Sequence, residues 1–164
     1  MVQVNNSGFS KFFFHSIIPK STKHYLHVLT FYGLKKILIV EDSNEILENT
    51  AEILQLAGYT VATAVNGVEG LKMAISEKPD LILCDIMMPQ MTGSELLEEL
   101  KKNVSTKNIP FLFFTASAEE SEIKIGLESG AFDYIVKPFD PDQLVSIIKE
   151  KIGDADVDSS TAKF

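Results

Sequence analysis

The feature that most constrains the fold is a strict alternation between short β-rich runs and segments of helical period. Five runs have strand composition: KILIVE (36–41), YTVATA (59–64), LILCD (81–85), IPFLFFT (109–115) and DYIVK (133–137). Alternation of this kind implies parallel strands joined by right-handed helical crossovers, with helices on both faces of the sheet. We therefore expect an α/β fold with a doubly wound, five-stranded parallel sheet and five helices.

The helical segments carry their own boundary signals. Ser43 is expected to cap the start of the first helix and Gly58 to end it. Three further helices should begin where a capping side chain precedes a carboxylate by three residues: Asn66 with Glu69, Thr92 with Glu95 and Ser117 with Glu120. Asp140 and Pro141 predict the start of the last helix, and Gly153 predicts its end.

Composition divides the chain into three zones within a length that suits one domain. Residues 1–34 hold all three histidines and no acidic residue, and we interpret them as an N-terminal extension of uncertain role. An accessory extension or an upstream start codon is favoured there over a membrane-surface or partner-binding segment. Residues 35–153 form the periodic domain. Residues 154–164 are polar and are expected to be a disordered tail.

Charge and cysteine content exclude several classes of protein. All 15 basic residues are lysines, and 23 acidic residues give a net charge of −8, so we expect no direct binding of nucleic acid. The single cysteine, Cys84, lies in an apolar run and reads as a small buried hydrophobe. Without an internal disulfide and without a membrane-length apolar run, a cytoplasmic location is expected.

Charged and hydroxyl side chains follow four of the five predicted strands. Glu41 and Asp42 end the first run, Asp85 the third, Thr115 the fourth and Lys137 the fifth. In a parallel sheet these positions meet at one edge, where three carboxylates would repel one another unless a cation binds. Oxygen ligands of this kind suit Mg2+. A hydroxyl and an ammonium suit a phosphoryl group, and Asp85 is the expected nucleophile, forming an acyl phosphate.

The segments KKILIVEDSNE, PDLILCDIMMPQMTG, FFTA and DYIVKPF closely resemble the receiver domain of two-component response regulators over residues 35–152. The single-domain chemotaxis and phosphorelay types are included in that resemblance. It implies a flavodoxin-like sheet in the order 2-1-3-4-5. It implies that Asp85 is the phosphoacceptor and that Lys137 contacts the phosphate. The implied Mg2+ ligands are Glu41, Asp42, Asp85 and the Met87 backbone carbonyl. Thr115 and Tyr134 would be the switch residues, and Pro138 would be a cis-proline.

The resemblance also implies partners. Residues 35–153 contain no histidine, so a histidine kinase or phosphotransfer protein should donate the phosphoryl group. Only 12 residues follow residue 152, which predicts output through a phosphorylation-dependent contact with an unknown downstream protein rather than an output domain. We expect the contact face to be the fourth helix, fifth strand and fifth helix, with phosphorylation-linked homodimerisation left open.

The chain is expected to be a signalling switch rather than an enzyme, catalysing only its own phosphotransfer and slow autodephosphorylation. Met87 and Ser117 occupy the two positions that tune dephosphorylation in the family, and neither is acidic or an amide. Two alternatives remain. A haloacid-dehalogenase-like phosphatase would carry D-x-D after the first strand, where this chain has EDSNE. A pseudo-receiver would act as a constitutive docking module. The intact set of site residues argues against this alternative.

Overall fold

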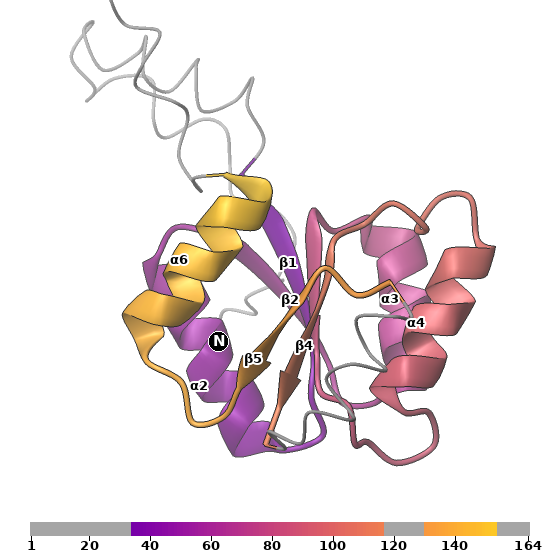
Figure 1. The fold of residues 1–164 in the computed structure, drawn as a ribbon, viewed down its shortest axis with the longest axis horizontal. Coiled ribbons are helices and arrows are strands. Elements are labelled where there is room, and N and C mark those ends of the chain that lie inside the picture. Colours follow the sequence, from indigo (N-terminus) through magenta and orange to yellow (C-terminus); the bar gives the residue numbers. More distant parts are fainter. Residues whose placement is uncertain (1–33, 117–129, 154–164) are drawn as a thin grey trace, which may run out of the picture. The chain divides into compact units, whose positions relative to one another are not determined.

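A computed structural model describes residues 34–116 and 130–153. Their strands form one parallel sheet in the order β2-β1-β3-β4-β5, which confirms the predicted topology. The central strand is therefore β3, and β2 and β5 are the edges (Figure 1). The strands are β1 (Lys36–Val40), β2 (Thr60–Ala64), β3 (Leu81–Cys84), β4 (Phe111–Thr115) and β5 (Asp133–Val136).

Helices cover both faces of this sheet, as the alternation predicted. Within the described ranges they are α2 (Asn44–Leu56), α3 (Gly67–Glu77), α4 (Gly93–Lys102) and α6 (Pro141–Ile152). Figure 1 shows α2 and α6 on one face and α3 and α4 on the other. The helix predicted from Ser117, residues 1–33 of the N-terminal extension and the tail 154–164 lie outside the described residues.

Two apolar layers sandwich the sheet. All four residues of β3 are buried, which explains its unbroken apolar run. Successive side chains on β4 enter opposite layers: Phe113 packs in the α3–α4 layer and Phe114 in the α2–α6 layer. Across residues 34–116 and 130–153, no helix is long and apolar enough to cross a membrane.

The predicted helix caps are mostly confirmed. The Asn66 side chain accepts from the Glu69 N–H, Thr92 and Glu95 form a complete capping box, and Asp140 caps α6. Ser43 is the exception: it occupies the N-cap position, but its side chain makes no capping hydrogen bond.

Each predicted strand exceeds the observed strand at one end, by one or two residues. The Tyr59 N–H donates to the Leu54 carbonyl and so closes the preceding helix, while Pro110 has no N–H to contribute to a ladder. At the other end, Glu41, Asp85 and Lys137 lie one residue beyond their strands. The charged groups therefore stand at the rim of the sheet rather than inside it.

Replacing Thr50 by valine should stabilise the domain. The Thr50 hydroxyl is buried in α2, and among the described residues it has no hydrogen-bond partner. Folding therefore removes it from water without compensation. Because Thr50→Val deletes the hydroxyl and keeps the branched shape, we expect the free energy of unfolding to rise by about 1 kcal/mol in urea denaturation followed by circular dichroism.

Thr106→Val is the matched control. The Thr106 hydroxyl is also buried, but it donates to the Leu100 carbonyl at 2.8 Å. Losing that hydrogen bond should lower the free energy of unfolding by about 1 kcal/mol. Equal destabilisation by the two substitutions would show that the Thr50 hydroxyl is satisfied in solution.

Candidate functional site

The carboxyl ends of the strands place the predicted site residues at one rim of the sheet. The ladder continues one residue past the strands: the Glu41 N–H donates to the Ala64 carbonyl at 3.0 Å and the Asp85 N–H to the Val40 carbonyl at 2.9 Å. The Lys137 N–H likewise donates to the Thr115 carbonyl at 2.7 Å. These backbone hydrogen bonds thus fix the Cα positions from which the three side chains extend.

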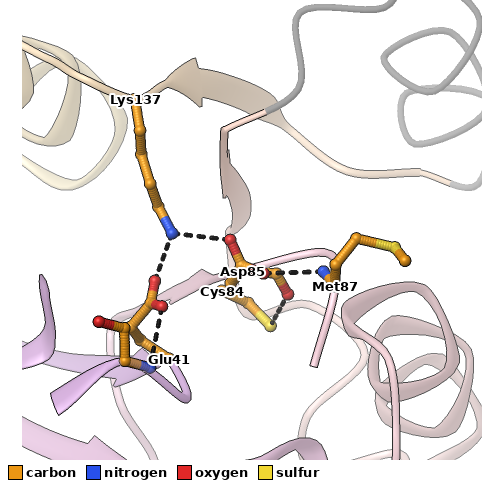
Figure 2. Close-up of polar contacts among 6 residues, drawn as sticks. Glu41, Cys84, Asp85, Met87 and Lys137 are labelled. Atoms are coloured by element: carbon orange, nitrogen blue, oxygen red, sulfur yellow. Dashed lines mark hydrogen bonds and ion pairs between the residues drawn. The ribbon is translucent and has the colours of Figure 1, made fainter. Parts of the chain in front are cut away.

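The ammonium of Lys137 joins two carboxylates from two other strands. Its Nζ donates to Asp85 Oδ1 at 2.7 Å and also to Glu41 Oε2 (Figure 2). Glu41 is 2% exposed and Asp85 is 6% exposed, so both charges are nearly withdrawn from water. The network therefore links the ends of β1, β3 and β5.

The electrostatics of Glu41 reflect this burial. Desolvation raises the pKa of the Glu41 carboxyl, and the hydrogen bond and positive charge of Lys137 oppose that shift. The other Glu41 oxygen accepts the Ser43 N–H at 3.2 Å. Glu41 is thus held by groups on both sides rather than left free to swing into solvent.

Asp85 is held in the same way. The Met87 N–H donates to Asp85 Oδ2 at 2.8 Å, while Met87 as a residue is 67% exposed. Behind the loop, the Gly93 N–H donates to the Ile86 carbonyl at 2.9 Å. A Cβ at Gly93 would lie 2.2 Å from the Asp85 carbonyl oxygen, so only glycine permits this close approach.

The remaining predicted site residues differ in exposure. Thr115 is buried at the end of β4, and Tyr134 is half-buried against the α3–α4 layer. The Lys137–Pro138 peptide bond is cis, as the resemblance implied. Asp42 is exposed beside Glu41, and within the described part of the chain its side chain makes no hydrogen bond or ion pair.

Cys84 is a core residue, as its sequence context predicted. It is fully buried, and burial together with the nearby Asp85 and Glu41 charges raises the pKa of its thiol well above the usual range. A thiol kept protonated is a poor nucleophile. Met88 is also buried in the α3–α4 layer, and Met91 packs against that layer.

The donor set suits a hard divalent cation. In residues 34–116 and 130–153, no three carboxylate, imidazole or thiol groups converge into a metal cluster by themselves. Mg2+ does not require one, because it typically takes one or two carboxylates and completes its shell with water and phosphate oxygens. The Glu41 and Asp85 carboxylates lie close enough to share the Lys137 ammonium, and exposed Asp42 follows Glu41, so carboxylate oxygens of the kind that Mg2+ uses are gathered at this rim.

Two residues of this site were missed by sequence reasoning. Gly93 is the first residue of α4, directly after the Thr92 cap, and a glycine beside a helical pattern could have signalled a close backbone approach. Phe114 lies under the Lys137 ammonium, with Nζ 4.1 Å from the ring centroid. No sequence signal distinguishes Phe114 from the other aromatic residues of its run.

Comparisons with known proteins agree with this geometry. The sequence profile described as "Response regulator receiver domain" matches residues 37–149. The phosphate regulon transcriptional regulatory protein PhoB of Pseudomonas aeruginosa is 44% identical over 115 residues, covering 70% of this chain and 50% of PhoB. The chain spans about half the length of PhoB and of other curated regulators that it matches.

Solved structures give the same result. The Vibrio cholerae chemotaxis protein CheY4 is similar with a TM-score of 0.70 and 34% identity, covering 73% of this chain and 99% of CheY4. A second match is the receiver domain of the Pseudomonas aeruginosa sensor histidine kinase PA1611, which is described with a magnesium ion coordinated in its active site cleft. Its TM-score is 0.69 and its sequence identity is 27%, and the match covers 74% of this chain and 100% of the PA1611 receiver domain. With the profile matching well over half of its length, the chain belongs to the family of response regulator receiver domains.

Proposed function

We propose that this receiver domain accepts a phosphoryl group on Asp85 from a histidine kinase or phosphotransfer protein and signals through a phosphorylation-dependent protein contact. The observation that carries the proposal is the position of Asp85. It ends the central strand, and its carboxylate bonds the Lys137 ammonium at 2.7 Å. In this proposal the attacking carboxylate and the cation that would contact the phosphoryl group are therefore neighbours.

The proposed reaction is a single phosphoryl transfer. An Asp85 carboxylate oxygen attacks phosphorus, an acyl phosphate bond forms, and the bond from phosphorus to the donor nitrogen breaks with its electron pair on the donor. Lys137 neutralises charge on the phosphoryl oxygens as they approach. The Met87 N–H, which now bonds Asp85 Oδ2, keeps the carboxylate oriented.

Glu41, Asp42, Asp85 and the Met87 backbone carbonyl would hold Mg2+ in this proposal. When bound, Mg2+ neutralises phosphoryl oxygens that a single ammonium cannot fully balance. Glu41 contributes from a buried position and Asp42 from an exposed one, so the proposed ligands line both the inner and the outer side of the rim.

Thr115 and Tyr134 are proposed to convert phosphorylation into a change of surface. Phe113 pairs with Tyr134 and Thr115 pairs with Val136, so strand alternation gives Thr115 and Tyr134 the same face of the sheet. A phosphoryl group on Asp85 would draw the Thr115 hydroxyl and free space beside it for the Tyr134 ring. This would bias a two-state equilibrium of the face that includes β5 and α6.

The output is proposed to be a contact with another protein. That protein is either an unknown downstream target or a second copy of this chain, bound when Asp85 is phosphorylated. The acidic, arginine-free composition supports a protein partner rather than direct contact with nucleic acid. PhoB is named a transcriptional regulatory protein, but this chain covers only half of it. A reducing, cytoplasmic setting suits the single buried thiol.

Asp85→Asn should abolish Mg2+-dependent labelling of the protein by radiolabelled acetyl phosphate or a cognate kinase, because an amide cannot form the acyl phosphate. The matched control is Asp80→Asn. Asp80 lies at the opposite end of β3 and pairs with Lys35 at 3.2 Å. The Asp80→Asn variant should be labelled to the same extent as the wild type. Labelling that survives Asp85→Asn would move the acceptor elsewhere, and an unlabelled wild type would favour the pseudo-receiver alternative.

The phosphoryl group should persist for minutes or longer, because the exposed Met87 side chain cannot orient an attacking water. Met87→Asn adds a group able to do so without disturbing the core, and we expect it to shorten the lifetime about tenfold. The lifetime is measured by removing the labelled donor on a desalting column and following the loss of label with Mg2+ kept in the buffer. Met87→Leu, the control, should leave it unchanged. A wild-type lifetime of seconds would refute this expectation.

A further inference from the structure

We propose that Phe114 is a positioning residue of the phosphorylation site: its ring holds the Lys137 ammonium in place through a cation–π contact. This inference rests on the proposed function for the role of Lys137 in phosphoryl transfer. The contact itself stands on the geometry, with Lys137 Nζ 4.1 Å from the centroid of the Phe114 ring. That distance is well within the range at which an ammonium is attracted to the face of an aromatic ring.

The surroundings make the contact stronger than a surface one. Phe114 is fully buried, and the Lys137 side chain is 11% exposed. Little water can compete for the ammonium, and cation–π attraction increases when the cation is desolvated. The ammonium is therefore held by the Asp85 and Glu41 carboxylates and by the electron-rich ring face of Phe114.

Strand pairing explains why these two residues meet. Phe114 pairs with Ile135 on the neighbouring strand, and both belong to the α2–α6 layer. Lys137 comes two residues after Ile135, so the same alternation aims its side chain at this layer. Its ammonium is then diagonal to Phe114, at a separation that a long side chain can span. Thr115, the next residue on β4, takes the opposite face.

A second aromatic residue fixes the ring. The rings of Phe114 and Phe139 have centroids 5.4 Å apart and a tilt of 47°. Phe139 packs against the α2–α6 layer together with residues of α6. Because Phe114 touches the ammonium and is itself packed against Phe139, it cannot withdraw from Lys137 without displacing core side chains.

The Phe114 ring attracts the Lys137 ammonium independently of the charge on Asp85. Lysine is a point charge on a flexible stem, and its ion pair with Asp85 depends on the negative charge of that carboxylate. Once Asp85 is phosphorylated, the oxygen bonded to phosphorus loses most of its negative charge, and the ammonium has to serve the phosphoryl oxygens instead. The attraction to Phe114 does not depend on the state of Asp85. It therefore keeps the ammonium at the site throughout the transfer.

The experiment varies the ring electronics while keeping its shape. In the full chain, Phe114 is replaced site-specifically by mono-, di- and trifluorinated phenylalanine, and Mg2+-dependent labelling by radiolabelled acetyl phosphate is timed. Fluorine withdraws electron density from the ring face, so the logarithm of the labelling rate should fall with each fluorine, to about a tenfold loss.

Phe113 is the matched control. It is also buried, it packs on another ring, Phe111, at 5.2 Å, and it faces the opposite layer from Lys137. The same fluorinated series at Phe113 should leave the labelling rate unchanged. Equal rates for the fluorinated and ordinary rings at Phe114, or an equal fall at Phe113, would overturn the positioning role.

Nuclear magnetic resonance separates the contact from the proposed function. The ring current of Phe114 should shift the Lys137 Hε protons upfield, and Phe114→Leu should abolish that shift whether or not the protein can be phosphorylated. A shift unaffected by Phe114→Leu would overturn the inference. Failure of the proposed function has a different signature, namely labelling that persists in Asp85→Asn while the Lys137 shift is present.

Discussion

The ion network of Lys137 is the interaction on which this domain depends. Two nearly buried carboxylates, Glu41 and Asp85, would be costly if left alone, and their counter-charge comes from Lys137, which follows them by 96 and 52 residues in the sequence. A buried ion pair adds little net stability, but removing one partner from it typically costs about 3–5 kcal/mol. The network therefore ties the integrity of the fold to the correct assembly of the rim.

The charges at this rim bear on the proposed binding of a phosphoryl group together with a divalent cation. Two carboxylates and one ammonium leave an excess of negative charge, and exposed Asp42 adds to it. A phosphorylated side chain carries about −1.5 to −2 at pH 7. Lys137 already serves both buried carboxylates, so it cannot balance that addition alone. The pKa of Glu41 is raised chiefly because burial desolvates its carboxylate, and the hydrogen bond and charge of Lys137 only oppose that rise.

The sequence predicts most of this arrangement because each signal involved is local or periodic. The alternation of strands and helices, the unbroken apolar run of β3 and the polar residues after four of the five runs are read from patterns a few residues long. The contact between Phe114 and Lys137 does not, because it depends on the register between two strands and on the side-chain conformation of a flexible lysine. Ser43 shows the converse: it has the right residue type for a cap, yet its side chain does not bond the helix.

The β4 strand joins the site to both apolar layers. Its last two residues face opposite ways: Thr115 shares a face with Tyr134, and Phe114 packs in the α2–α6 layer. A change of charge at Asp85 acts on the Lys137 ammonium, and Phe114 connects that ammonium to Phe139, two residues before α6 begins. Packed side chains transmit such a displacement because the interior has little free volume. The Phe114–Phe139 pair thus connects the site to the α6 side of the sheet by direct packing, on the opposite face from the proposed route through Thr115 and Tyr134.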